Sequence, residues 1–266
     1  MNTQPKVYQF DSAIVRKPAL SVSRGLRAID LGCPDYQAVK GEHDAYVEAL
    51  MEAGLSVQIL EALEEFPDSI FVEDPALVFP QGAILLNPGT ESRAGEVAAI
   101  APTLRQRFET VLELPGGYVD GGDVLNTPAG VMIGTSERTN QGGADALIEC
   151  LADLGLKGMI FKTPDNVLHF KSDCSLLDET TILSTKRLAD SGVFKDFNPL
   201  ITPAGEEAAA NALRVNDTIL IGAGYPGTLR LLKDNGYNVV TLKVSEIGKI
   251  DAGLSCMSLR WHSKEE

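Results

Sequence analysis

Residues Gly117-Tyr-Val-Asp120-Gly-Gly-Asp123-Val-Leu125 lead through a turn at Thr127-Pro-Ala-Gly130 into a second apolar run, Val131-Met-Ile-Gly134. Apolar runs on either side of a turn rich in Pro and Gly predict a β-hairpin. Acidic residues and paired glycines stand in the first run, where a buried strand would be apolar. This stretch decides the fold because the same arrangement, a hairpin entered through polar residues, returns along the chain.

The repeated hairpins predict a radial architecture. Second strands of the copies begin near residues 83, 131, 181 and 218, and a fifth copy begins at Gly253 and pairs with Ala13 to Arg16 across the termini. Most hairpins are followed by a polar loop, a helix and a short strand. Five strand–strand–helix–strand units at periods of about 20–50 residues predict an α/β radial array around a central channel. We expect one domain over residues 1–266. The clearest helices are Arg93 to Phe108, Gly142 to Leu154 and Gly227 to Asn235.

Composition narrows the class of protein. The 266 residues are 44% hydrophobic and 23% charged, with a net charge of −14, which argues against nucleic acid and anionic membranes as partners. No apolar run reaches the length of about 18 residues that a membrane span needs, and no secretory signal is visible. Unpaired cysteine spacing predicts a reducing, cytoplasmic location, and the sequence leaves homodimer formation open. Three His and four scattered Cys predict no metal site: His43, His169, His262, Cys33, Cys150, Cys174 and Cys256.

The copies share one further feature. In the first strand of each copy, at about the same position, stands a polar or reactive residue. Hairpin-like sequence patterns occur in any α/β protein, but ordinary apolar strands do not carry polar or reactive residues at the same position of every hairpin. The radial array therefore predicts that five side chains converge on its axis: Asp74, Asp120, His169, Asn211 and Cys256.

Cys256 and His169 are the residue types of a nucleophile and its acid/base partner, brought together in space and not in sequence. Asp120 can orient the imidazole as the third member of a triad does. Each residue alone also has a structural interpretation: a buried cysteine, a hydrogen-bonded core histidine and a polar turn. For Asp123 the alternatives are a turn or a supporting role behind the triad. His43, beside Glu42 and Asp44, is expected to be a solvated surface histidine.

Further charged residues suggest what the axis binds. Glu73 and Asp74 are two acids in a buried strand, so each needs a partner, either an internal Arg or a cationic substrate. Asp68 lines the mouth of the channel or is a turn acid. Arg93 and Arg138 occupy matching loop positions and either clamp a carboxylate with forked hydrogen bonds or lie on the surface.

The chain resembles the dimethylarginine dimethylaminohydrolases, within the guanidino-group-modifying superfamily, and the resemblance implies a five-bladed α/β-propeller. It covers nearly the whole chain, with the motifs in the family's order. The matching segments are Phe66-Pro-Asp-Ser-Ile-Phe-Val-Glu-Asp74, Ser92-Arg93, Val119-Asp-Gly-Gly-Asp-Val-Leu125, Ser136-Glu-Arg-Thr-Asn-Gln141, Leu168-His-Phe-Lys-Ser172 and Ile250-Asp-Ala-Gly-Leu-Ser-Cys256. The last departs slightly from the Asp-Gly-Leu-Thr-Cys pattern expected in the family.

The resemblance implies an activity: hydrolysis of Nω-methylated L-arginine to L-citrulline and a methylamine through a covalent cysteine intermediate, without metal or organic cofactor. The alternatives are an arginine deiminase, another substituted-guanidine hydrolase or amidinotransferase, and a non-catalytic binding protein of the same shape. The implied catalytic residues are Cys256, His169 and Asp120. The implied residues around a small cationic guanidine substrate are Leu26 on a flap, Asp68, Glu73, Asp74, Arg93, Arg138, Ile250 and Asp251.

Overall fold

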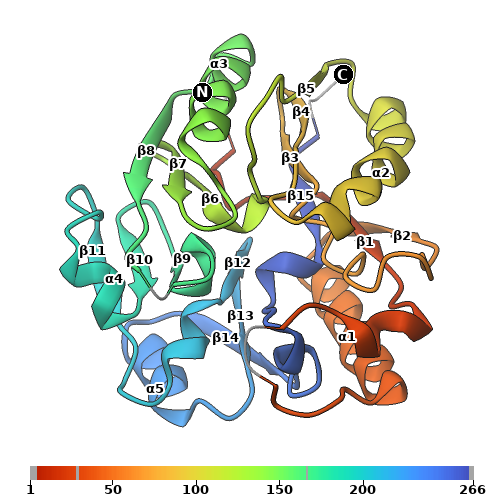
Figure 1. Ribbon diagram of the computed structural model, residues 1–266. Helices are drawn as coiled ribbons and strands as arrows, with labels where there is room; N and C mark the ends of the chain where they lie inside the picture. The colour runs from red at the N-terminus through yellow and green to blue at the C-terminus, as the bar shows by residue number, and fades with distance from the viewer. Residues whose placement is uncertain (1–4, 28–29, 166, 264–266) are drawn as a thin grey trace.

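The computed structural model describes residues 5–27, 30–165 and 167–263. Five three-stranded sheets are arranged around a central axis, and the helices lie outside them (Figure 1). From the inner to the outer strand, the sheets are β15 (Leu259–Trp261), β1 (Ser12–Arg16) and β2 (Ser56–Leu60); β3 (Ala76–Phe79), β4 (Gly82–Leu85) and β5 (Val111–Glu113); β6 (Val124–Thr127), β7 (Gly130–Thr135) and β8 (Gly158–Lys162); β9 (Cys174–Leu176), β10 (Thr181–Ser184) and β11 (Asn198–Ile201); and β12 (Leu213–Val215), β13 (Thr218–Gly222) and β14 (Asn238–Leu242).

Every sheet has the same internal order. The inner strand is antiparallel to the middle strand, and the middle strand is parallel to the outer one. A hairpin suffices for the first pairing, whereas parallel neighbours need a crossover, which the helix supplies. The predicted unit of strand, strand, helix and strand is therefore confirmed. The helices are α1 (Tyr36–Glu52), α2 (Ala94–Arg107), α3 (Gln141–Asp153), α4 (Lys186–Asp190) and α5 (Pro226–Asp234).

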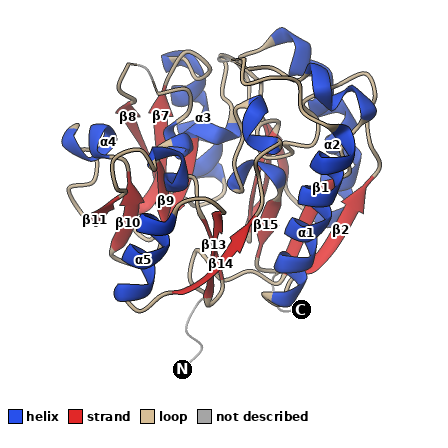
Figure 2. Ribbon diagram, turned by 90° about the horizontal axis from the view of Figure 1, so that it is seen from below, coloured by secondary structure: helices blue, strands red, loops and turns tan. Residues whose placement is uncertain are grey.

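The ring closes through the two ends of the chain, as the sequence predicts. Strand β1 pairs with β15 in antiparallel register, Ala13 opposite Arg260 and Ile14 opposite Leu259. Close to this pairing, the side chain of Asn216 holds the segment before β1 to the end of α1. Its amide oxygen accepts a hydrogen bond from the backbone N–H of Phe10, and its amide nitrogen donates to the carbonyls of Phe10 and Ala53. Because the ring is closed, each of the five sheets has a neighbouring sheet on both sides. Figure 2 shows the described ends of the chain at the same side of the molecule.

Buried apolar side chains form five clusters, and each lies between two neighbouring sheets. One cluster joins β3–β5 to β6–β8 and includes Ile84, Ile133 and Leu147, which are fully buried. The other four join the remaining neighbours around the ring in the same way. Because apolar burial is distributed between blades, polar groups can occupy the axis without interrupting a single central core.

The position of the axial residues differs from the prediction. They do not lie in the inner strands but in turns and 3₁₀ segments just before them. A turn releases a residue from the alternating faces of a strand, so its side chain can point along the axis. Asp74 precedes β3, Asp120 precedes the turn Gly121–Asp123, His169 precedes Phe170–Ser172, Asn211 follows Glu207–Ala210, and Cys256 lies within Ser255–Met257.

The expectation for His43 is wrong. His43 is only 1% exposed, on the face of α1 that also buries Val39, Tyr46 and Leu50. The spacing of these residues puts them on one side of a helix. Burial lowers the pKa of His43 to about 4. Its charged neighbour Glu42 is also buried and accepts hydrogen bonds from the backbone of residues 246 and 247.

Membrane insertion has no support in the helices. Over the described ranges, each helix is too short or too polar to span a bilayer.

Two adjacent glycines at the start of α3 allow a matched test of the fold. A Cβ on Gly143 would lie 2.2 Å from the carbonyl oxygen of Tyr118, whereas a Cβ on Gly142 meets nothing closer than 3.9 Å. We expect Gly143→Ala to lower the free energy of unfolding by about 1–3 kcal/mol, the usual cost of overpacking. Gly142→Ala is expected to be neutral or to stabilise by up to about 1 kcal/mol. Chemical denaturation measures both; equal effects would contradict this packing.

Candidate active site

The axis begins with a buried ion-pair network around Arg93. This side chain is 4% exposed, and its Nη1 donates to Asp74 Oδ2. Nε and Nη2 donate to the two carboxylate oxygens of Glu96, at 3.0 and 2.7 Å, and Nη2 also donates to the carbonyl of Phe71 at 2.9 Å. Burial raises the pKa of Asp74, but the charges of Arg93 and His169 and the hydrogen bonds from Arg93 and Gly122 together hold that pKa below its usual range. Asp74 is therefore a buried anion with one oxygen fixed by a guanidinium.

Glu73, next to Asp74, points to a different set of cations. Its Oε1 lies 2.5 Å from Lys171 Nζ and 3.3 Å from Arg260 Nη2. Its Oε2 accepts a hydrogen bond of 3.2 Å from the hydroxyl of Ser255. The backbone N–H of Glu73 donates to the carbonyl of Cys256 at 3.2 Å. Glu73 is thus tied both to the cysteine segment and to two cations behind it.

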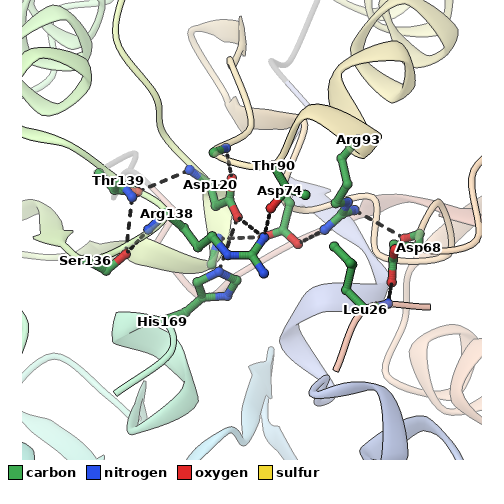
Figure 3. A network of polar contacts seen from close by, with 12 residues as sticks. Leu26, Asp68, Asp74, Thr90, Arg93, Asp120, Ser136, Arg138, Thr139 and His169 are labelled. Carbon is green, nitrogen blue, oxygen red and sulfur yellow. Dashed lines mark hydrogen bonds and ion pairs between the residues drawn. The ribbon is translucent and has the colours of Figure 1, made fainter. Parts of the chain in front are cut away.

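Asp120 and His169 face each other, as predicted (Figure 3). Asp120 Oδ2 lies 3.3 Å from His169 Nε2, without the alignment of a full hydrogen bond, and neither atom has another hydrogen-bond partner among the described residues. The other oxygen of Asp120 accepts from the backbone N–H of Gly89 at 2.7 Å. Arg138 Nη1 lies 3.9 Å from Asp120 Oδ2 and donates to the hydroxyl of Thr90. Asp120 is fully buried, so its contact with His169 is an ion pair in a dry setting whenever the imidazole is protonated.

Asp123 supports this pair from behind. One of its oxygens accepts from the backbone N–H of Phe170 at 2.8 Å, which fixes the residue after His169. The other accepts from the hydroxyls of Ser136 and Thr139, both at 2.7 Å. The Thr139 hydroxyl also accepts from the backbone N–H of Asp120 at 3.2 Å. Of the two sequence-based alternatives for Asp123, the geometry agrees with the supporting one.

Cys256 is buried in the 3₁₀ segment Ser255–Met257, just before β15. The amide nitrogen of Asn211 lies 4.0 Å from its Sγ, and the hydroxyl of Ser255 lies 3.9 Å from it. The amide oxygen of Asn211 accepts from the Ser255 backbone at 3.2 Å, which turns the NH₂ end of the amide toward the sulfur. Burial raises the pKa of the Cys256 thiol to about 11, and the charges of Glu73 and Asp74 act in the same direction.

His169 has the opposite electrostatic setting. Burial lowers the pKa of its imidazole, but the contact with Asp120 and the charges of Asp74 and Asp123 raise it to about 9. In the free protein near neutral pH, the site therefore contains a thiol at Cys256 and an imidazolium at His169. The charge of Asp74 raises the pKa of both groups.

Leu26, on the predicted flap, lies beside Asp68 (Figure 3). The backbone N–H of Leu26 donates to Asp68 Oδ1 at 2.9 Å, and the carbonyl of Asp68 accepts from Arg93 at 3.2 Å. A Cβ on Gly25 would lie 2.9 Å from that Asp68 oxygen and 3.2 Å from Ile250, so glycine permits the close approach of the flap. Asp251 follows Ile250 in the left-handed conformation, with φ 55°, and turns the chain back toward Cys256.

Within the described ranges, one group of side chains is close enough to hold a cation: Asp74, Asp120 and His169, whose ligand atoms lie within 4.8 Å of one another. Arg93 occupies one oxygen of Asp74, and the backbone N–H of Gly122 occupies the other at 3.0 Å. Protein donors thus already engage both oxygens of Asp74 in this cluster.

Sequence reasoning missed the cations behind Glu73. Lys171 stands two residues after His169, and Arg260 lies in β15 between apolar residues. A charged residue inside a short apolar strand was a usable signal for Arg260. It also missed Glu96 as a partner of Arg93. The expected contact of Arg93 with a substrate stays a prediction, because protein acceptors surround its guanidinium.

A thiol, an imidazole–carboxylate pair and buried acids on the axis of five α/β blades define the class of guanidino-group-modifying enzymes with the five-bladed propeller fold. The chain is 38% identical over 254 residues to the N(G),N(G)-dimethylarginine dimethylaminohydrolase of Pseudomonas aeruginosa, covering 95% of this chain and all of the relative. The chain belongs to the dimethylarginine dimethylaminohydrolase family.

Solved structures agree with this assignment. A Cys-to-Ser variant of the Pseudomonas aeruginosa enzyme, complexed with citrulline, superposes with a TM-score of 0.92 at 37% identity, covering 95% of this chain and all of that one. A His-to-Gly dimethylarginine dimethylaminohydrolase as an adduct with S-methyl-L-thiocitrulline gives 0.91 at 38% identity, covering 94% and 99%. No profile of a protein family matches the chain.

The raised pKa of His169 predicts a pH dependence of stability. A group with a folded pKa of about 9 and an ordinary value of 6.5 stabilises the fold fully below pH 6.5 and loses this contribution as pH rises through 9. The loss amounts to about 3 kcal/mol at most. In Asp120→Asn we expect a shallower fall of the unfolding free energy over that window, and an imidazole midpoint closer to 6.5 by NMR. The exposed Asp190→Asn is the control; parallel curves for Asp120→Asn and wild type would refute the assignment.

Proposed function

We propose that this protein hydrolyses Nω-methylated L-arginine to L-citrulline and the corresponding methylamine, with Cys256 as nucleophile and His169 as acid and base. One observation carries this proposal: buried Cys256 and half-buried His169, a neutral thiol and a cationic imidazole, share the buried carboxylate of Asp74 as a neighbour. The citrulline complex and the thiocitrulline adduct of the relatives support the same product and a covalent route.

Substrate recognition follows from charge. A guanidinium is planar and permanently cationic, and carboxylates bind it through paired hydrogen bonds. Glu73 and Asp74 are two buried carboxylates beside the cysteine segment, and the resemblance implies that the buried acid Asp68 lines the site as well. Arg138 keeps 24% of its side chain exposed and is the available cation for the substrate carboxylate. Leu26, Ile250 and Asp251 then line the entry, as the resemblance implies.

The substrate itself prepares the nucleophile. Burial and the charges of Glu73 and Asp74 raise the pKa of the Cys256 thiol. A guanidinium placed between the carboxylates and Cys256 adds a positive charge that counteracts this rise, so the thiol loses its proton to solvent as the substrate binds. The thiolate adds to the guanidinium carbon. His169, protonated in the free site, donates its proton to the departing methylamine nitrogen, and the C–N bond breaks to leave a thiouronium bound to Cys256.

Hydrolysis reverses the role of the imidazole. His169, now neutral, takes a proton from water, the hydroxide adds to the thiouronium carbon, and the C–S bond breaks to release L-citrulline and the cysteine. Asp120 holds the imidazole and stabilises its protonated form, at 3.3 Å from Nε2. In this sequence His169 gives one proton to the leaving amine and takes one from water, and solvent takes the proton of the thiol.

The same proposal covers organisation and location. Pairing of β1 with β15 supports one domain over residues 1–266, because the two ends of the chain complete one sheet. Four free cysteines support a reducing, cytoplasmic setting.

A paired product assay tests the reaction. The purified protein is incubated with asymmetric dimethylarginine, monomethylarginine or arginine, and citrulline is quantified together with the released amine. We expect citrulline and dimethylamine in equal amounts from the first substrate. In Cys256→Ser we expect turnover to fall by at least about 10³-fold, because a hydroxyl is a weaker nucleophile than a thiolate. Substrate binding should persist, because the carboxylates that bind the guanidinium are unchanged.

The outcomes separate the alternatives. Ammonia from arginine, with no amine from the methylated substrates, would indicate a deiminase. Exposed Cys33→Ser is the matched control and should retain full turnover. Steady turnover by Cys256→Ser at the wild-type rate would remove Cys256 from the mechanism.

A further inference from the structure

A second cavity lies on the axis, behind Glu73. It has a volume of about 130 Å³, and all five inner strands line it: β3, β6, β9, β12 and β15. Glu73 and Ser255 reach its wall, but Cys256, His169 and Asp74 do not. The cavity is therefore separate from the reacting groups, and the proposed hydrolysis gives it no role.

The wall of this axial cavity is cationic. Three cations line it, Lys171, Arg214 and Arg260, against the single carboxylate of Glu73. Lys171 and Arg260 both contact the same Glu73 oxygen, so one negative charge serves two positive ones. Arg214 lies over the ring of Tyr8, at 5.1 Å, and 4.0 Å from Asp217, a fully exposed acid. The wall thus carries an excess of about two positive charges.

Two donors of this wall lack acceptors. The Nε of Arg260 and the hydroxyl of Ser175 are buried and have no hydrogen-bond partner among the described residues. Both residues line the axial cavity. A buried donor without an acceptor loses its hydrogen bond to water and gains nothing in return, so such groups normally serve a ligand or an ordered water. Excess positive charge and unused donors together favour a ligand that is an anion and an acceptor.

An approach from outside has no acid in its lining. An adjoining hollow of about 320 Å³ shares Phe10, Asn126 and Arg260 with the axial cavity. Lys6, which pairs with Glu179 outside the lining, and Lys157 line this hollow, and none of its lining residues is Asp or Glu. A recess lined by charge of one sign attracts small ions of the opposite sign.

We propose that the axial cavity is a binding site for a small inorganic oxyanion of the phosphate or sulfate type. The guanidinium groups of Arg214 and Arg260 and the hydroxyl of Ser175 are its donors. Guanidinium forks match the oxygens of such anions in pairs. A tetrahedral anion of five heavy atoms fits a cavity of this volume, which is several times the space that one water needs. Water can satisfy the donors, but it leaves the positive charges without a counter-charge.

Inorganic phosphate is the probe for the test. Isothermal titration calorimetry and thermal unfolding are performed at constant ionic strength with sodium gluconate, whose anion is too large for the cavity. We expect saturable binding and a rise of Tm that follows the same dissociation constant. In Arg214→Gln the dissociation constant should increase by about tenfold or more, since a charged hydrogen-bond partner is lost. Arg230→Gln, an exposed arginine on α5, is the matched control and should bind as wild type.

Ser175→Ala gives a test that does not depend on a large substitution. Without phosphate this variant should be as stable as wild type or more stable, because it removes a hydroxyl that has no partner. With phosphate it should gain less in Tm than wild type does. A gain in Tm that is linear in phosphate and equal in all four proteins, with no heat of binding, would show that the cavity holds only water and would overturn the proposal.

Discussion

The buried carboxylates along the axis must each be paired with a positive charge, and the structure depends on this constraint. Asp74, Glu73 and Asp120 are almost completely removed from water, and an isolated buried carboxylate is too costly to persist ionised. Each therefore meets a cation from another part of the chain: Arg93 from the start of α2, Lys171 from the segment after His169, and His169 itself. Two of these pairs, Glu73–Lys171 and Asp120–His169, join residues from different blades, so assembly of the ring also assembles the site.

The same charges create a site that is incomplete without a substrate. Burial and the acids around the axis raise the pKa of the Cys256 thiol, and the acids also raise the pKa of His169 against the effect of burial. A small cation beside these acids counteracts the rise at the thiol, while the contact with Asp120 continues to favour the protonated imidazole until the leaving group needs a proton. A guanidinium is thus both the species to be attacked and the charge that makes the attack feasible. The acids of the axis thus select for cations.

Distribution of the apolar core explains how so many polar groups fit at the centre. Each of the five clusters is shared by two blades, and each blade contributes an inner strand to the axis. Glu73 then divides the axis into two compartments. One contains the cysteine and the imidazole, and the other contains Arg214, Arg260 and unused donors. The Glu73 side chain contacts Ser255, next to the cysteine, and also contacts the cations Lys171 and Arg260 of the second compartment.

The sequence by itself determined the repeat, its closure through the termini and the residue types on the axis, because hairpin turns, helix periods and in-phase polar residues are local patterns. It indicated Cys256, His169 and Asp120 for the same reason. The tertiary structure alone decided which charges meet. Arg93 could be a surface residue or a substrate clamp in the sequence, and only packing put Glu96 and Asp74 against it. His43 looked solvated because its neighbours are acidic, yet the helix turns it inward. Burial and ion pairing depend on residues distant in sequence, so the pKa values that govern the chemistry follow from the assembled ring and not from any single motif.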